Sequence, residues 1–267
     1  MLNTLKPKST STEAIPKPNK IQKVLVIGAS GYLGRYLCDV MASDFDLLRL
    51  DIAEAPGPGD FLLGSVTDRN LINDACQQVD ALVLAHMAPN RTDAYDWPDS
   101  SMDINVKGVA LALEAAARNN IRRVILISSV AVVWGHVEQG TYLTRNLPPR
   151  PTDVYGMTKM LQEEVASFYH RVRGIEIAVL RPAYILREDS LINKYGETRP
   201  MVTWQCIDPR DIGRAVTGSL QVQNLEYEVF YLMAGPGADE HVDVASSHKR
   251  LGWKPEHLFL GLPVEQI

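Results

Sequence analysis

The chain has 267 residues, of which 46% are hydrophobic and 22% are charged, and its formal net charge at pH 7 is −5. A chain of this length and composition can bury a core without disulfides or structural metals. The acidic balance gives no nucleic-acid-binding footprint, and no apolar run approaches the ~20 residues of a membrane-spanning helix. The three cysteines are far apart, without metal or redox spacing, which is typical of reduced thiols in a cytoplasmic protein.

Residues 1–20 differ in composition from the rest of the chain. They are rich in proline, serine, threonine and lysine and contain no continuous apolar segment. Without the apolar core of a secretory signal, this composition favours a flexible N-terminal tail. A transit peptide is the alternative, and the absence of arginine disfavours it.

The stretch 23–34 reads K-V-L-V-I-G-A-S-G-Y-L-G and predicts a strand, a glycine turn and a helix. The apolar run before the turn is typical of a strand buried on both faces, and helical spacing of apolar residues begins at Tyr32. Here Gly28 allows the tight turn, Gly31 lets a pyrophosphate approach the backbone, and Gly34 allows the helix to pack closely on the strand. The stretch therefore predicts a dinucleotide site, with the phosphates at the helix N-terminus.

Asp51 follows the predicted second strand, 46–50, and lies 23 residues after Gly28. An acid near this spacing accepts hydrogen bonds from the adenosine ribose and repels a 2′-phosphate, so the pattern favours NAD over NADP. Arg35 and Arg49 are the basic residues that could reverse this preference. A solvated acid at the end of a strand is the alternative interpretation of Asp51.

Strands and helices alternate from there to Pro182, which predicts a parallel α/β sheet of the doubly wound, Rossmann type. Further strands are expected at 61–63, 80–84, 124–127 and 175–180, and helices beginning at Thr67 or Asp68 and covering 103–119 and 153–173. The polar segment 90–101 is expected to be a loop.

Two of these segments carry further expectations. His86 follows the strand at 80–84 on the side of the sheet where ligands bind, so it could line the cofactor site. A histidine bonded to a backbone carbonyl is the alternative that we favour. The helix at 103–119 has apolar residues on more than one face, which predicts burial on a second side by another subunit.

The last quarter of the chain is less regular. Its pattern predicts strands at 202–207 and 229–233 and helices at 208–222 and 243–251. We expect three regions: the flexible tail 1–20, a dinucleotide-binding domain 21–182 that includes the 153–173 helix, and a small substrate-binding or lid region 183–267 interleaved with the main sheet.

Tyr155 and Lys159 stand four residues apart on one predicted helix, so their side chains share a face. A tyrosine titrates near pH 10 and is a poor base at neutral pH, but an adjacent ammonium and an oxidised nicotinamide ring would both favour its phenolate. Tyr155 could then take a proton from a substrate hydroxyl while the carbon transfers hydride to the ring, and Lys159 could also hold the nicotinamide ribose. In isolation an exposed i,i+4 pair is the alternative, but the dinucleotide fingerprint favours the catalytic interpretation.

Together these motifs resemble an extended short-chain dehydrogenase/reductase of the NAD-dependent epimerase/dehydratase family. The resemblance runs from about Lys23 to Pro255 and rests on G-A-S-G-Y-L-G, Asp51, N-V-K-G at 105–108, I-S-S-V-A-V-V-W-G at 127–135, Y-G-M-T-K at 155–159, L-R-P at 180–182, I-D-P-R-D-I-G-R-A at 207–215 and L-G-W-K-P at 251–255. It implies a Rossmann-type domain that binds NAD, catalysis by Tyr155 and Lys159, and a homodimer formed through the helices at 103–119 and 153–173.

The chain departs from the family pattern at three places. Val130 stands where members carry a Ser or Thr that hydrogen-bonds the reacting oxygen, so Ser129, Thr141 or His136 would have to replace that donor. On a regular strand Ser129 would point to the opposite face from Val130, unless a bulge turned its hydroxyl inward. Ser65 replaces the usual acid at the adenine position, and Arg187-Glu188 replace the family's Gly-Pro pair.

The resemblance implies an NAD-dependent dehydrogenase or 4-epimerase that acts on a secondary alcohol of a sugar, sugar acid or nucleotide sugar. The chain's compact length is closest to that of uronate dehydrogenases, and Arg145, Arg150 and Arg187 could bind an acidic substrate or simply be solvated. The alternative, supported by Val130, is a catalytically weak or inactive NAD-binding module. The predicted catalytic residues are Tyr155, Lys159 and Ser129. No metal site is predicted, and the predicted cofactor-binding residues are Gly28, Ser30, Gly31, Tyr32, Leu33, Gly34, Asp51, Ser65, Val66, Ala85, His86, Asn105, Tyr155, Lys159 and Pro182.

Overall fold

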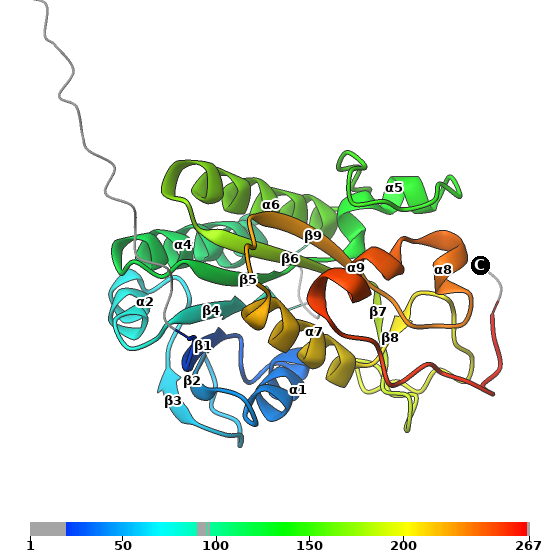
Figure 1. Ribbon diagram of the computed structural model, residues 1–267, viewed down its shortest axis with the longest axis horizontal. Helices are drawn as coiled ribbons and strands as arrows, with labels where there is room; N and C mark the ends of the chain where they lie inside the picture. Colours follow the sequence, from blue (N-terminus) through cyan, green and yellow to red (C-terminus); the bar gives the residue numbers. More distant parts are fainter. Residues whose placement is uncertain (1–19, 90–94, 96, 266–267) are drawn as a thin grey trace, which may run out of the picture.

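The computed structural model describes residues 20–89, 95 and 97–265. Its main sheet has seven strands in the order β3-β2-β1-β4-β5-β6-β9, and every neighbouring pair is parallel (Figure 1). This order, in which the chain leaves β1 in both directions, is that of the doubly wound dinucleotide-binding fold, so the predicted fold class is confirmed. The strands are β1 Lys23–Ile27, β2 Asp46–Asp51, β3 Asp60–Leu63, β4 Ala81–Leu84, β5 Arg123–Ile127, β6 Glu176–Pro182 and β9 Tyr227–Leu232.

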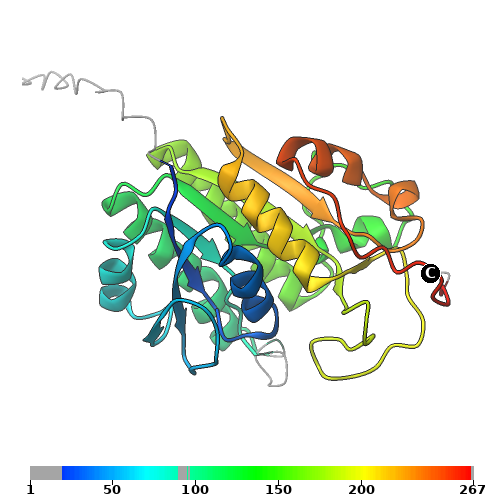
Figure 2. The same ribbon diagram turned by 60° about the horizontal axis from the view of Figure 1, so that its bottom comes forward.

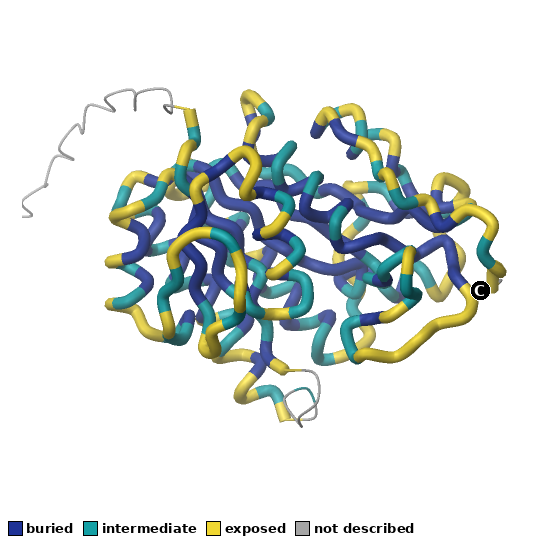
Figure 3. The backbone as a smooth tube through the Cα atoms, turned by 90° about the horizontal axis from the view of Figure 1, so that it is seen from below, coloured by how far each residue is buried: buried dark blue, intermediate teal, exposed yellow. Residues whose placement is uncertain are grey.

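Helices cover both faces of this sheet (Figures 1 and 2). Alternate residues of β1 point to opposite faces: Val24 and Val26 pack with α1 and α7, whereas Leu25 packs on the side of α2, α4 and α6. The buried strands therefore form the centre of the molecule, between two apolar layers (Figure 3). The helices are α1 Tyr32–Met41, α2 Arg69–Cys76, α4 Gly108–Arg118, α6 Val154–Arg173 and α7 Pro209–Gln221.

Local signals explain where the helices begin and end. The carboxylates of Asp68 and Asp153 accept backbone N–H groups at the starts of α2 and α6, and Gly174 ends α6 in the left-handed conformation. Of the two predicted N-caps for α2, Asp68 is therefore the cap and Thr67 is not. Asp208 and Asp243 cap later helices in the same way.

The helix predicted at 103–119 is not continuous. A short helix, α3 Asp99–Ser101, leads into a π-helical segment, η2 Met102–Lys107, and regular α-helix begins only at Gly108. The buried carboxamide of Asn105 accepts the Ala88 N–H at 2.7 Å and donates to the Thr158 hydroxyl at 3.0 Å, which holds this wider turn in place. The helix α4 packs against both α2 and α6 of the same chain, so its apolar residues on more than one face need no second subunit.

The last third of the chain contributes to the main sheet as well as to a smaller region beside it. The strand β9 pairs with β6, and α7 packs against α1, while β7 Tyr184–Ile185 and β8 Cys206–Ile207 form a separate parallel pair. The strand predicted at 202–207 is therefore mostly wrong, because Val202 bridges to Val264 near the C-terminus instead. Three short helices complete this region: α5 Trp134–Val137, α8 Ala238–His241 and α9 Val244–Leu251.

Two expectations concern segments at the limits of the structure. The predicted flexible tail lies outside the described residues except for Lys20, as do residues 90–94 and 96 of the loop predicted at 90–101. The loop prediction is wrong at its end, because residues 99–101 form the short helix α3. Within the part of the chain that the structure describes, no helix combines the length and the apolar character needed to cross a membrane.

Candidate active site

The glycine turn after β1 has the geometry of a phosphate-binding turn. Gly28 adopts a φ of +88°, and a Cβ atom at Gly34 would overlap the carbonyl oxygen of Gly28. Gly31 forms the N-terminal cap of α1 without any side-chain hydrogen bond to the first N–H groups of the helix. The hydroxyl of Ser30 is buried there and has no hydrogen-bond partner among the described residues. Free helix N–H groups and an unpaired hydroxyl fit the pyrophosphate of a dinucleotide.

Asp51 lies at the end of β2, directly beside this turn. One carboxylate oxygen accepts the Ser30 N–H at 2.9 Å, and the other accepts the Ile52 N–H at 2.7 Å. Asp51 is therefore not simply a solvated strand-end acid. Arg49 donates to the carbonyl oxygens of Ala55 and Gly59, which engages its guanidinium in the loop after β2.

A pocket of about 350 Å³ extends from the glycine turn to the predicted catalytic residues. Nine of the predicted site residues line it together with Ser129: Gly28, Gly31, Tyr32, Leu33, Gly34, Ala85, Tyr155, Lys159 and Pro182. Residues far apart in the sequence thus meet at the carboxyl ends of β1, β4, β5 and β6, where ligands bind in doubly wound folds. Most of its exposed lining is apolar, as in small-molecule sites generally.

Four predicted cofactor-binding residues lie outside both the pocket lining and the glycine turn with Ser30 and Asp51; three of these four, Ser65, Val66 and His86, follow β3 or β4. The Ser65 hydroxyl pairs with the Thr67 hydroxyl at 2.8 Å, and Val66 is buried against Gly108. His86 is also buried against Gly108, next to the backbone of Ile104. Burial, with the nearby Lys159 charge, lowers the pKa of His86 to about 3, so this ring is neutral at physiological pH.

Asn105, the fourth such residue, has a different position from the one expected. Its side chain is fully buried, and its carboxamide is occupied by Ala88, Thr158 and the Tyr95 hydroxyl. The amide group therefore has no capacity left for a ligand and acts on the protein itself. Asn105 ties the segment after β4 to α6 and so supports Tyr155 from behind.

Tyr155 and Lys159 occupy successive turns at the start of α6, as their spacing predicts. Lys159 is buried and its Nζ donates to the Ile127 carbonyl at the end of β5, at 2.9 Å. Burial and the Lys194 charge lower the pKa of Lys159 to about 7, while the Glu163 carboxylate opposes this shift. The ammonium of Lys159 therefore loses its proton within the physiological pH range.

The pKa of Tyr155 is shifted in the opposite direction from the one expected from the neighbouring Lys159. Burial raises the pKa of the Tyr155 phenol well above its ordinary value, and the nearby Tyr95, Tyr195 and Asp153 add to this rise. A hydrogen bond with the Ser129 hydroxyl acts in the opposite direction. The chain's own groups thus leave the phenol protonated, because burial outweighs the lowering effect of Ser129.

Ser129, not Val130, presents its hydroxyl to Tyr155. The strand β5 ends at Ile127, and a 3-10 helix, η3 Val130–Val133, begins right after Ser129, so strand alternation does not apply here. The Ser129 hydroxyl accepts the Ala131 N–H at 3.1 Å as the cap of this helix, which leaves its own hydrogen free to donate. Val130 is buried in an apolar cluster with Tyr231.

The other two candidate donors do not reach the pocket. A ring nitrogen of His136 pairs with the Pro148 carbonyl oxygen at 3.0 Å, and Thr141 is exposed. Neither side chain belongs to the pocket lining. Of the three replacements considered for the family's missing hydroxyl, the geometry singles out Ser129.

A buried ion pair behind the pocket was not found by sequence reasoning. Arg181 donates two hydrogen bonds to Glu163, at 2.9 and 2.6 Å, and the Ser128 hydroxyl donates to the same carboxylate at 2.5 Å. Glu163 lies one turn after Lys159. This spacing is visible in the sequence, but it is also common among exposed ion pairs, so it did not predict a buried one. The pair fixes Ser128, which lines the pocket, and places a carboxylate near Lys159.

The segment between β7 and β8 also reaches the pocket, which no motif predicted. Its residues Asn193, Lys194 and Tyr195 line the pocket, and the Tyr32 hydroxyl in the glycine turn donates to the Ile192 carbonyl at 3.2 Å. Tyr95 packs edge-on against the Tyr155 ring, with centroids 5.5 Å apart. Loop residues of this kind have no fixed spacing from a motif, so the sequence carried no usable signal for them.

A smaller hollow of about 260 Å³ adjoins the pocket and shares Ser129, Ala183 and Tyr184 with it. Its other lining residues include Asp153 and Gln205. Because Ser129 belongs to both linings, this hollow suits a small polar molecule that presents an oxygen to Ser129.

The three arginines considered for an acidic substrate are engaged elsewhere. Arg187 pairs with Asp189, Arg145 pairs with Glu228, and Arg150 donates to the Gln139 side chain at 2.5 Å. None of the three lines either hollow beside Ser129.

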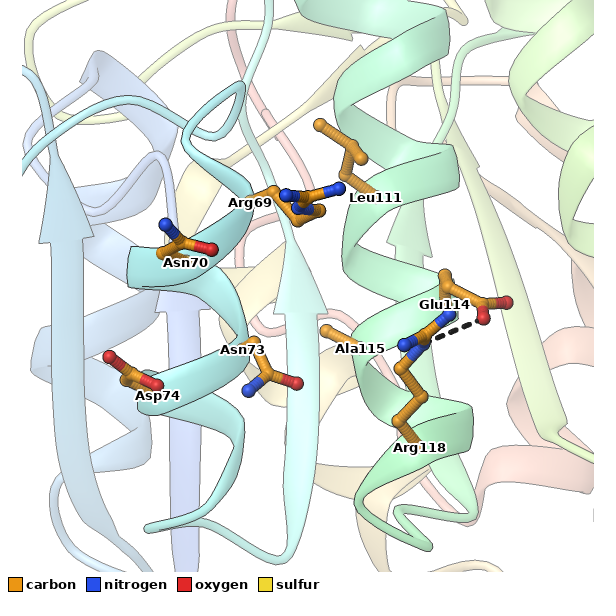
Figure 4. Close-up of a pocket in the computed structure, with 8 residues that line it drawn as sticks. All are labelled: Arg69, Asn70, Asn73, Asp74, Leu111, Glu114, Ala115 and Arg118. Atoms are coloured by element: carbon orange, nitrogen blue, oxygen red, sulfur yellow. Dashed lines mark hydrogen bonds and ion pairs between the residues drawn. The ribbon is translucent and has the colours of Figure 1, made fainter.

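A third hollow, of about 470 Å³, lies between α2 and α4, away from these residues (Figure 4). Arg118 and Glu114 form an ion pair along its α4 side, and Asn70, Asn73 and Asp74 lie on the opposite helix. No residue predicted for the site from the sequence lines this hollow.

Comparisons with known proteins agree with the geometry. The model of the NAD dependent epimerase/dehydratase family matches residues 24–186. An L-arabinose 1-dehydrogenase (NAD(P)(+)) from Haloferax volcanii is 23% identical over 87% of this chain and 96% of its own length. A uronate dehydrogenase from Pseudomonas syringae pv. tomato is 30% identical over 78% of this chain and 73% of its own length.

Solved structures show the same fold. A short-chain dehydrogenase/reductase superfamily protein from Agrobacterium tumefaciens with bound NAD superposes with a TM-score of 0.75 at 19% identity, covering 88% of this chain and 93% of that one. A UDP-glucuronic acid 4-epimerase from Bacillus cereus in complex with NAD gives a TM-score of 0.72 at 18% identity, covering 91% and 97%. At these identities the likeness concerns the fold alone.

Proposed function

Because the chain belongs to the NAD-dependent epimerase/dehydratase family, we propose that it is an NAD-dependent oxidoreductase of the extended short-chain dehydrogenase type that oxidises a secondary alcohol of a sugar or sugar acid. The dehydrogenase relatives that match along most of their own length act on sugars by their names, which supports this substrate class. The observation that carries the proposal is the meeting of Ser129, Tyr155 and Lys159 in a pocket continuous with the glycine turn.

The three side chains have distinct roles in this proposal. Ser129 donates its hydroxyl hydrogen to the substrate oxygen and holds it against Tyr155. As a phenolate, Tyr155 would accept the proton of the substrate hydroxyl as the general base. The Lys159 ammonium, while charged, and a bound oxidised nicotinamide would both favour this phenolate over the protonated phenol of the free protein. NAD, when bound, supplies the redox chemistry by accepting the two electrons of the alcohol.

The residues at the glycine turn fit the cofactor. The N-terminus of α1 and the Ser30 hydroxyl would hold the pyrophosphate, and the pocket wall from Ala85 to Pro182 would hold the nicotinamide end. Asp51 supports NAD over NADP, because a carboxylate at the end of β2 repels a 2′-phosphate. Ser65 and Val66 remain candidates for the adenine end.

The size of the site favours net oxidation of a single sugar over epimerisation of a nucleotide sugar. The hollow beside Ser129 measures about 260 Å³, below the roughly 300–1,000 Å³ of sites for larger ligands. A single sugar suits this space better than a sugar with a nucleotide attached.

The test is reduction of NAD, followed by NADH absorbance, against free sugars, uronates and nucleotide sugars. We expect a free sugar or uronate to be oxidised, and we expect Tyr155→Phe to lose this activity while still binding NAD. Tyr142→Phe is the matched control, since that tyrosine is 47% exposed and does not line the pocket. NAD binding without turnover of any panel member would favour the inactive binding module.

We also propose a homodimer formed through α6 and the segment of α4 beside it. Phe168 and Val172, one turn apart on α6, are 48% and 56% exposed and form an apolar strip on that surface. Light scattering after size-exclusion chromatography should give twice the chain mass. Replacing Phe168 with aspartate should shift the protein towards the monomer, and a monomeric wild type would refute this part.

A further inference from the structure

Lys194 occupies a fixed position over the pocket. The neighbouring Asn193 is buried; its Nδ2 donates to the Tyr184 hydroxyl at 2.9 Å, and its Oδ1 accepts the Tyr195 N–H at 2.9 Å. The backbone on each side of Lys194 is therefore tied to β7 and to the loop itself. Backbone held in this way keeps Lys194 over the pocket before a ligand arrives, which lowers the ordering cost of binding.

The ammonium of Lys194 lies next to the reacting end of the pocket. Its Nζ is 5.9 Å from the centroid of the Tyr155 ring and 5.0 Å from that of Tyr195. The Nζ of Lys159 also lies 5.9 Å from the Tyr155 centroid. Two ammonium groups thus stand close to one phenol, and the Lys194 charge is felt by Lys159, whose pKa it lowers.

None of the residues that the structure describes neutralises this positive charge. The pocket lining contains the two lysines and no aspartate or glutamate. Among the described residues, no carboxylate oxygen lies within 4.0 Å of the Lys194 Nζ, whereas Arg145 and Arg187 each have a partner. Asp153, in the adjoining hollow, accepts the N–H of Gly156 at 2.6 Å as the cap of α6. An unpaired, half-buried ammonium at the reacting end fits an anionic ligand.

We propose that Lys194 binds the carboxylate of the substrate, so that the enzyme selects sugar acids over the matching neutral sugars. The loop that carries Lys194 also borders the predicted phosphate site, because the Ile192 carbonyl accepts the Tyr32 hydroxyl at the start of α1. With the carboxylate assignment, Lys194→Met keeps its affinity for NAD, and a loss of that affinity would assign Lys194 to the cofactor phosphates instead. This assignment of substrate class rests on the proposed function. Lys194 thus takes the role of binding an acidic substrate, for which the sequence had suggested Arg145, Arg150 and Arg187.

Binding measurements test this assignment independently of turnover. Calorimetry on the Tyr155→Phe protein with NAD compares D-galacturonate with D-galactose, and D-glucuronate with D-glucose. A hydrogen bond to a charged group stabilises by about 1.5–3 kcal/mol, so we expect one acid to bind roughly 10- to 100-fold more tightly than its neutral partner. In the same background, Lys194→Met should remove most of this preference and Lys194→Arg should keep it. Added salt should weaken the preference of the Lys194 protein.

The controls exclude a general effect of losing a lysine. Lys249→Met, an exposed position on α9, should leave the preference unchanged, and the unfolding temperature of Lys194→Met should equal that of the parent protein. In the active enzyme, Lys194→Met should raise KM for the sugar acid with little change in kcat. D-galactose 6-phosphate serves as a second anion.

Each result decides the assignment. Four results with the sugars would overturn it: equal binding of acid and neutral sugar, a preference that survives Lys194→Met, tighter binding of the sugar phosphate than of the uronate, and no binding of any of these ligands. A Lys194-dependent preference without NAD reduction would refute the proposed function and leave the carboxylate site standing. Turnover of neutral sugars without any preference for acids would overturn the carboxylate site and leave the proposed function standing.

Discussion

Replacement of Ser129 by alanine tests the main departure of this chain from its family. Ser129 has two roles in the structure: its oxygen accepts the Ala131 N–H, and its hydroxyl acts on the Tyr155 phenol, whose pKa it lowers. The substitution removes both while leaving the Tyr155 ring and Lys159 in place. The proposal therefore expects a fall in catalysis that exceeds any loss of stability.

The magnitude follows from the two lost interactions. Loss of a donor to the reacting oxygen costs about 10²- to 10³-fold in kcat, or about 2.7–4 kcal/mol. Loss of the helix cap costs about 1 kcal/mol of stability, because the Ala131 N–H at the start of η3 loses its partner. We expect kcat to fall by this factor with a small change in KM, since the substrate keeps its other contacts.

Steady-state NAD reduction and thermal unfolding are measured on Ser129→Ala, Ser129→Thr and Val130→Ser. The threonine variant should keep most of the activity. Val130→Ser should not raise the rate, and it should destabilise the protein by about 1–3 kcal/mol, because Val130 is 4% exposed in an apolar cluster. A Ser129→Ala enzyme within threefold of the wild type, or a gain in rate from Val130→Ser, would refute this reasoning.

Three further predictions follow from buried groups and close approaches. Lys159→Met should abolish NAD reduction but raise the free energy of unfolding by about 1 kcal/mol or more, because burial lowers the pKa of Lys159 and so makes its ammonium unfavourable in the folded protein. Denaturant titration checks this, and a loss of stability would contradict it. Gly31→Ala should fold normally but lose NAD affinity by calorimetry, whereas Gly34→Ala should be unstable, because a Cβ meets only ordinary contact distance at Gly31 but overlaps backbone at Gly34. Because the pKa of His86 is lowered in the folded protein, the unfolded chain takes up this proton first on acidification. The free energy of unfolding should therefore fall between pH 6.5 and about 3, by at most ~1.4 kcal/mol for each pH unit. This slope should be smaller in His86→Gln.

The fold could be predicted from the sequence because its signals are local and repeated. The apolar strand, the glycine turn and the helix from Tyr32 are contiguous, and the same alternation continues to Pro182. The π-helical turn at 102–107 could not be predicted, because it depends on a contact between Asn105 and Ala88 across the fold. The strand expected at 202–207 failed for a similar reason, since the C-terminal segment pairs with Val202.

The site shows the same division. Tyr155, Lys159 and the glycines are fixed by spacing within a single element, and the structure brings them to one pocket. The choice between Ser129 and Val130 depends on where β5 ends, which periodicity defines only to within a residue or two. Lys194 and Tyr95 come from loops, whose path over the pocket is set by tertiary contacts such as those of Asn193. The raised pKa of Tyr155 depends on burial, which no spacing reveals.

The central claim is that Tyr155 acts as the base in an NAD-dependent oxidation of a sugar or sugar acid. The most direct measurement is the amount of NADH formed against the amount of oxidised product, for the wild type and Tyr155→Phe side by side. The account predicts equal amounts of NADH and oxidised product from the wild type and no detectable NADH from Tyr155→Phe that still binds NAD. A Tyr155→Phe enzyme with an unchanged rate, or a wild type that converts sugars without forming NADH, would contradict it.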